Sequence, residues 1–137
     1  MHTRLFSLFL AFAVGLAACS DDPTGPQIPD LQGTYDYTAP IDDIDGARWT
    51  GTLNLFHDGG ETFTGSFSVA VTGGGVTTET IHGDLSQGTI EPDGTIHFRL
   101  TDAFRHDGQV QGGAITGTWL ISGADQNYSG TFTASRR

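Results

Sequence analysis

A five-residue motif that recurs along the chain constrains its fold more than any other feature. The motif is an apolar residue, any residue, glycine, any residue and a second apolar residue, as in Trp49-Thr50-Gly51-Thr52-Leu53. Threonine and serine fill the alternate positions, and this alternation of period two predicts β-strands with one buried face. The six copies are Leu31–Tyr35, Trp49–Leu53, Phe63–Phe67, Ile81–Leu85, Ile115–Trp119 and Tyr128–Phe132, and a degenerate seventh is His106–Val110.

The glycines of this motif fall on the predicted buried face, where glycine is unfavourable unless the sheet needs it. Missing side chains let a sheet coil tightly, and the gaps accept large aromatic side chains from neighbouring strands. The connections between strands are short and contain glycine, which favours antiparallel hairpins. The predicted strands are residues 33–38, 48–57, 62–72, 76–90 with a kink near 86–88, 95–101, 104–111, 114–122 and 127–135.

This pattern predicts an all-β fold, an eight-stranded antiparallel up-and-down meander barrel, which leaves no exposed sheet edges. The alternative is a two-sheet β-sandwich, with up to nine strands if the kinked fourth strand is split. No segment after the first 18 residues shows helical periodicity.

The N-terminus has the features of an export signal. Arg4 precedes an apolar run over residues 5–15, which is shorter than the about 20 residues that span a bilayer. The run ends in Leu16-Ala17-Ala18-Cys19, which resembles the lipobox of bacterial lipoproteins. That resemblance implies cleavage before Cys19 and transfer of a diacylglycerol to its thiol. The alternative is an ordinary cleaved signal followed by an incidental cysteine.

Three regions follow from these patterns: a signal peptide over residues 1–18, the lipidated Cys19 with a flexible tether over 19–30, and a β-barrel domain over 31–137. The segment 20–30 contains three prolines and few apolar residues, so it cannot form a core. Two or three acyl chains anchor a protein stably. The resemblance implies a bacterial cell-envelope location, and Ser20 after the cysteine favours the outer membrane, with the domain facing the periplasm or the cell surface.

The charge balance excludes some partners. The chain has no lysine, 6 arginines and 16 acidic residues, for a formal charge of -10. Because it offers no basic run to neutralise phosphates, nucleic-acid binding is not expected. The single cysteine cannot form an intramolecular disulfide, so the fold must rely on its hydrophobic core.

No catalytic motif is present, so we expect neither an enzyme nor a cofactor. The segment Asp42-Asp43-Ile44-Asp45-Gly46 is similar to a calcium loop but lacks its bidentate glutamate, so we interpret it as a solvated acidic loop and predict no metal site. His82 and His97 have outward parity on consecutive predicted strands, where they could face each other. We interpret this exposed pair as incidental, and His57 as the start of a turn.

The barrel region resembles the calycin-type small barrels of lipocalins and avidins. Their strands carry similar Gly-Thr-aromatic segments, here Gly33-Thr34-Tyr35 and Gly117-Thr118-Trp119. The last strand, Gly130–Arg136, also resembles the C-terminal strand of an uncharacterised family of bacterial lipoproteins. These resemblances imply the architecture and specify no ligand.

Alternating strand directions place one rim of the predicted barrel away from the tether. The loops of this distal rim contain five acidic residues, namely Asp42, Asp43, Asp45, Asp102 and Asp125. The interior nearest this rim mixes aromatic rings with two ionisable groups, which is typical of a small-ligand pocket. The predicted ligand-binding residues are Tyr37, Trp49, Glu79, His106 and Tyr128. The alternative is that Glu79 and His106 merely reach water at the barrel end.

Three functions remain open on the sequence. The first is an envelope lipoprotein whose lipocalin-like barrel binds a small apolar or aromatic ligand. The second is a structural or interaction protein whose acidic rim binds a basic protein partner. The third and least favoured is an enzyme that uses Glu79 and His106 as an acid–base pair.

Overall fold

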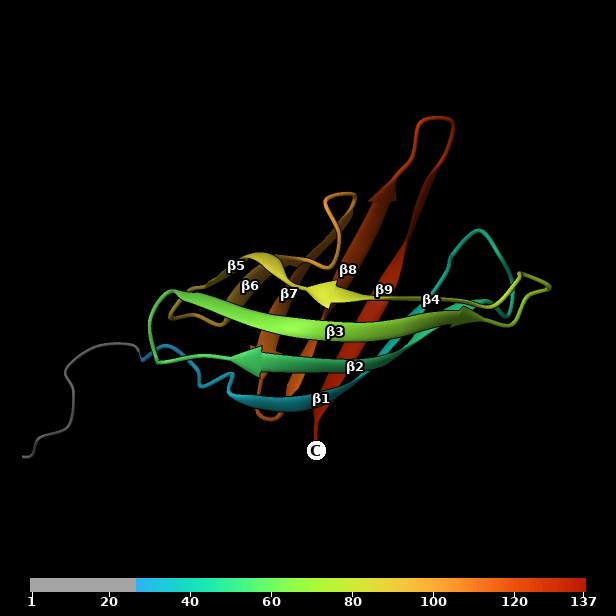
Figure 1. Cartoon of the computed structure of the whole chain (residues 1–137). Helices are drawn as coiled ribbons and strands as arrows, with labels where there is room; N and C mark the ends of the chain where they lie inside the picture. Colours follow the sequence, from blue (N-terminus) through green and yellow to red (C-terminus); the bar gives the residue numbers. More distant parts are fainter. Residues whose placement is uncertain (1–26) are drawn as a thin grey trace, which may run out of the picture.

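The computed structural model describes residues 27–137 (Figure 1). The predicted signal, Cys19 and the first part of the predicted tether lie outside the described residues. The described part contains nine antiparallel β-strands, and no helix in it is long and apolar enough to cross a membrane. The strands are β1 (Gly33–Pro40), β2 (Arg48–Phe56), β3 (Thr62–Thr72), β4 (Glu79–Asp84), β5 (Ser86–Ile90), β6 (Thr95–Arg99), β7 (Phe104–Gln111), β8 (Ala114–Ser122) and β9 (Asn127–Arg136).

Eight of the strands form a closed ring, which confirms the predicted barrel and excludes the sandwich. The ring runs β1-β2-β3-β5-β6-β7-β8-β9 and closes where β9 pairs with β1, as at Tyr37 and Ala134. Strand β4 lies outside the ring because it pairs only with β3 (Figure 1). The β6–β7 hairpin turns at residues 100–103, so no strand lies on the other side of β4.

The predicted kink in the fourth strand is confirmed and separates β4 from β5. The pairing of β5 with β6 shifts register between Ser86 and Thr89. Gln87 lies in this bulge with a φ of 53°, the one non-glycine residue with positive φ in the described part of the chain. A bulge of this kind bends the strand and redirects a side chain.

The motif glycines allow the backbones of neighbouring strands to approach closely. A Cβ built on Gly51 would lie 2.0 Å from the Ser68 carbonyl oxygen, and one on Gly117 would lie 2.1 Å from that of Asp107. Aromatic rings also occupy the gaps, since a Cβ on Gly108 would lie 3.1 Å from the Phe132 ring. Both observations agree with the curvature that the sequence predicts.

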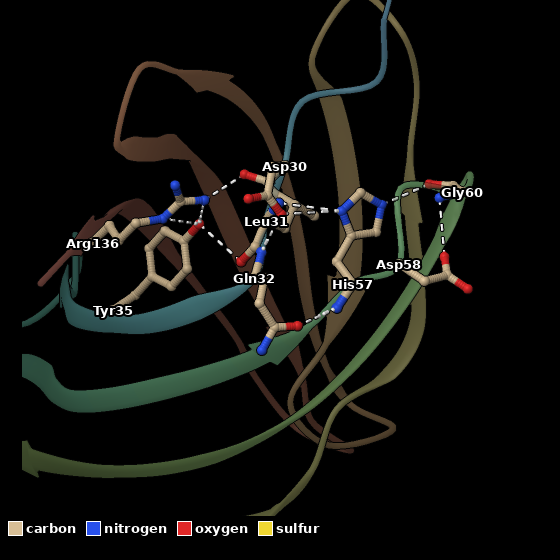
Figure 2. A network of polar contacts seen from close by, with 8 residues as sticks. All are labelled: Asp30, Leu31, Gln32, Tyr35, His57, Asp58, Gly60 and Arg136. Carbon is tan, nitrogen blue, oxygen red and sulfur yellow. Dashed lines mark hydrogen bonds and ion pairs between the residues drawn. The ribbon is translucent and has the colours of Figure 1, made fainter.

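The tether end of the barrel is closed by a polar network around buried Leu31 (Figure 2). Tyr35 Oη donates to the Leu31 carbonyl at 3.0 Å and accepts from Arg136 Nη2 at 2.8 Å. Arg136 also donates to the Asp30 carbonyl. Ile28 packs against the core, so contact with the barrel begins within the predicted tether.

His57 belongs to the same network (Figure 2). The sequence predicts only that this residue starts a turn. Its Nδ1 accepts from the Leu31 N–H at 3.2 Å, so Nε2 carries the proton and donates to the Gly60 carbonyl at 2.7 Å. The imidazole therefore ties the residue that plugs this end of the barrel to the β2–β3 turn.

At the opposite end, the loop after β1 folds back over the barrel. Ile41 and Ala47 in this loop are buried, and the Asp42 N–H donates to the Ser129 carbonyl of β9 at 3.0 Å. The aspartates of the predicted distal rim, Asp42, Asp43, Asp45, Asp102 and Asp125, are all exposed.

Candidate functional site

His106 is the centre of the barrel interior. Apart from the tyrosines, it is the only polar residue among the fully buried side chains of the described part of the chain, at 0% exposure. Its register partners are Phe98 on β6 and Trp119 on β8. The imidazole stacks on the Phe98 ring with centroids 4.6 Å apart, lies 4.6 Å from the Phe104 ring and meets the Phe132 ring edge-on at 4.9 Å.

Tyr37 and His106 form the one polar contact inside this aromatic cluster. Tyr37 Oη and His106 Nε2 lie 2.7 Å apart and share a hydrogen bond. Burial lowers the pKa of His106 to about 3 and raises the pKa of Tyr37 well above its ordinary value. Both groups are therefore neutral near pH 7, so the pair provides hydrogen bonding but no charge.

Trp49 borders the same cluster with an unused hydrogen-bond donor. Its ring lies 5.5 Å from the Phe104 ring, and its side chain is 9% exposed. Trp49 Nε1 and His106 Nδ1 are the two buried side-chain polar atoms without a hydrogen-bond partner within residues 27–137. By contrast, Trp119 Nε1 donates to the Thr131 carbonyl at 3.0 Å.

The other two predicted ligand-binding residues lie outside the buried cluster. Glu79 shares the inward parity of its register partner Val71, but its side chain is exposed because β4 has left the ring. The structure therefore does not bring Glu79 into contact with His106. Tyr128 is partly buried beside Ile121, and its hydroxyl donates to the Gln126 side chain at 3.3 Å.

The Phe98 and Phe104 rings, like that of Phe132, pack against His106 and were not part of the predicted site. Parity places Phe98 inside the barrel, but only as part of the apolar core, and Phe104 begins a strand directly after a turn. In the structure their rings cover two sides of the His106 imidazole. Strand parity could have found both residues, but it could not show that these rings fill the interior around His106.

The suggestion that His82 and His97 face each other is wrong. His82 on β4 pairs with Ser68 on β3, whereas His97 on β6 lies between Thr89 and Asp107. The two histidines do not lie opposite each other, because β4 and β6 do not pair. Within residues 27–137, no three His, Cys, Asp or Glu side chains converge to hold a metal ion.

Comparison with known proteins supports the fold. A solved structure of EF1p2_mFAP2b bound to DFHBI is similar to this chain, with a TM-score of 0.50 and 17% sequence identity over 78% of this chain and 94% of that chain. At this identity the likeness concerns the fold alone, an eight-stranded antiparallel β-barrel. No protein-family model and no curated protein matches the chain.

Proposed function

We propose that this chain is a lipid-anchored envelope protein whose barrel binds a small, flat, apolar or aromatic ligand at its distal end. The observation that carries the proposal is the buried, unpartnered Trp49 Nε1 beside the aromatic cluster around His106. Buried polar atoms are almost always hydrogen-bonded, so the unpartnered Trp49 Nε1–H donor suits a largely apolar ligand that offers one hydrogen-bond acceptor. The likeness to a barrel that is bound to DFHBI also supports the proposal.

The ligand would reach this cluster beside β4. The inward-parity residues at this end, Ile81 and Ile121, are only partly buried, and Glu79 is exposed. Since β4 is hydrogen-bonded on one side only, it can separate from the interior at lower cost than a strand with two neighbours. A flat apolar molecule would then contact the Trp49 and Phe104 rings.

Tryptophan fluorescence tests this proposal directly. In the Trp119→Phe variant Trp49 is the remaining tryptophan, and we expect the neutral dye phenylnaphthylamine to quench its emission in a saturable manner. In the Trp49→Phe variant the remaining Trp119, whose ring lies 5.3 Å from that of Phe104, is a second reporter of the same site.

Two adjacent substitutions serve as a matched pair for this experiment. A carboxylate at the inward, partly buried Ile121 should abolish quenching, whereas one at its outward neighbour Leu120, which is 38% exposed, should not. Both variants, Ile121→Glu and Leu120→Glu, would be compared with the parent by thermal unfolding. Equal quenching in the two folded variants, or quenching that never saturates, would contradict the proposed site.

The anchoring part of the proposal rests on the lipobox-like segment that ends at Cys19. The described chain meets the barrel at the end opposite the proposed ligand site, so the site would face away from the membrane. The Cys19→Ser variant should move from the detergent phase to the aqueous phase after expression in a bacterial host. If the protein with the parent sequence also partitioned into the aqueous phase, it would carry no lipid and the anchoring part of the proposal would be wrong.

A further inference from the structure

The outer face of β6 and β7 carries a polar cluster that the ligand site does not use. The cluster surrounds a shallow hollow on the barrel wall beside the β5 bulge. Its side chains are Gln87, His97, Arg99, Arg105 and Asp107.

Asp107 organises one half of this cluster. Its carboxylate accepts from His97 Nδ1 at 2.5 Å and from Arg105 Nε at 2.9 Å. Partial burial raises the pKa of Asp107, but the hydrogen bonds from His97 and Arg105 outweigh that effect and hold the pKa below its ordinary value. The carboxylate therefore stays charged, and it fixes the orientation of both partners.

Arg99 forms the other half and has no carboxylate partner within residues 27–137. Its Nε donates to Gln87 Oε1 at 3.0 Å and its Nη1 to the Asp102 carbonyl at 2.6 Å. These neutral acceptors hold the guanidinium without neutralising it. Gln87 is available as an acceptor because the bulge, with its φ of 53°, places this residue beside Arg99. A backbone strained in this way is often found at functional sites.

Arg99 and Arg105 thus line the same hollow with a single carboxylate, that of Asp107, which pairs with Arg105. Arg99 and Arg105 are direct register partners, and like charges in that position destabilise a sheet. The pairing is notable in a chain with 6 arginines and a formal charge of -10. No hydrogen bond within the described chain uses Arg99 Nη2, Arg105 Nη1 or His97 Nε2.

We infer that this hollow is a second binding site, on the outer wall of the barrel, for the oxyanion group of a small ligand, either a carboxylate or a phosphate. Arg99, Arg105 and His97 all line the hollow and each keeps an unused donor, and charge-assisted hydrogen bonds from guanidinium groups suit both kinds of oxyanion. Asp107 acts as a positioning residue, because it orients His97 and Arg105. The bound anion offsets the repulsion between the positive charges of Arg99 and Arg105.

The test is a titration of the purified protein with sodium phosphate and, separately, with sodium acetate, followed by the NMR signals of the His97 ring. Sodium chloride at matched ionic strength and constant pH is the reference. We expect saturable shifts with at least one of the two oxyanions that chloride does not reproduce. Saturation with phosphate alone or with acetate alone identifies which group the hollow takes.

Arginine variants decide whether the shifts report this site. Arg99→Gln and, as a more exposed alternative, Arg105→Gln should each weaken binding about tenfold, the usual effect of losing one charge-assisted hydrogen bond. Arg137→Gln, which removes an arginine paired with Asp36 at the tether end, should leave the titration unchanged. Shifts that follow ionic strength alone, or that persist equally in folded Arg99 and Arg105 variants, would overturn the inference. Quenching of Trp49 by phenylnaphthylamine tests the other site separately.

Discussion

At the scale of single residues, His106 shows how the barrel interior accommodates a titratable group. Burial keeps the imidazole neutral, Tyr37 provides one hydrogen bond, and stacked rings cover the remaining faces. A buried neutral histidine makes the fold sensitive to acid, because its imidazole binds a proton at higher pH in the unfolded chain than in the folded chain.

This sensitivity can be measured with the His106→Phe variant. The folded pKa of about 3 lies below the unfolded value of 6.5, so the contribution of His106 is complete above pH 6.5 and is lost as the pH falls toward 3. Between pH 7 and pH 5 the parent should lose about 2 kcal/mol of unfolding free energy from this group. Urea unfolding at the two pH values should show a smaller loss for the variant, and equal losses would mean that His106 is protonated in the folded state.

The sequence predicts the placement of these residues better than their roles. Parity correctly places Tyr37, Trp49 and His106 inside the barrel, because alternation along a strand depends on its own residues. It fails for Glu79, since exposure there depends on whether a neighbouring strand exists, and the early turn of β6 into β7 removes that neighbour. The Arg99–Arg105 pairing depends on register between strands, which local sequence does not specify.

At the scale of the strands, the repeated glycines perform different tasks in the same motif. At Gly51, Gly65 and Gly117, on strands of the ring, they make room for the backbone of a neighbouring strand. On β4, which has no second neighbour, the nearest atom to a Cβ on Gly83 would be a Phe67 ring atom at 3.6 Å, an ordinary contact distance. Glycine is therefore sterically required at motif positions where the backbone of a neighbouring strand lies against it.

Alanine substitution should separate these two cases. Gly117→Ala forces the β7 backbone away and should cost about 1–3 kcal/mol or more, whereas Gly83→Ala should change the unfolding free energy by no more than about 0.5 kcal/mol. Thr118→Val, on the outer face next to Gly117, should be as mild as Gly83→Ala. Urea unfolding of the three variants provides the measurement, and equal effects at Gly117 and Gly83 would disprove the steric explanation.

At the scale of the whole molecule, the barrel has one sealed end and one adaptable end. Leu31, Tyr35, His57 and Arg136 seal the tether end through hydrogen bonds from three separate parts of the chain (Figure 2). At the distal end, exposed acidic loops surround a partly buried rim, and β4 lies outside the ring (Figure 1). The polar network therefore lies at one end, and the site that we propose for the ligand lies at the other.

Two neighbouring arginines allow the seal to be tested. Arg136→Ala removes hydrogen bonds to Tyr35 and Asp30 and a cation–π contact at 5.4 Å, and should cost about 1–2 kcal/mol. Arg137→Ala removes an exposed ion pair with Asp36 and should cost less than about 1 kcal/mol. Urea unfolding compares the two, and hydrogen exchange at the Leu31 amide should speed up only in the Arg136 variant.

The seal at the tether end also determines how the barrel would carry mechanical load. A pull applied through residues before Asp30 would reach Asp30 and then Leu31, which is held by His57 from the end of β2 and by Tyr35 from β1. Arg136 of β9 shares that load through Asp30 and Tyr35, so the force divides among three strands at once. Hydrogen bonds loaded in parallel resist rupture together, whereas those of a strand peeled from its end break one after another. Under such a load β1 would stay in the barrel wall until these hydrogen bonds had broken.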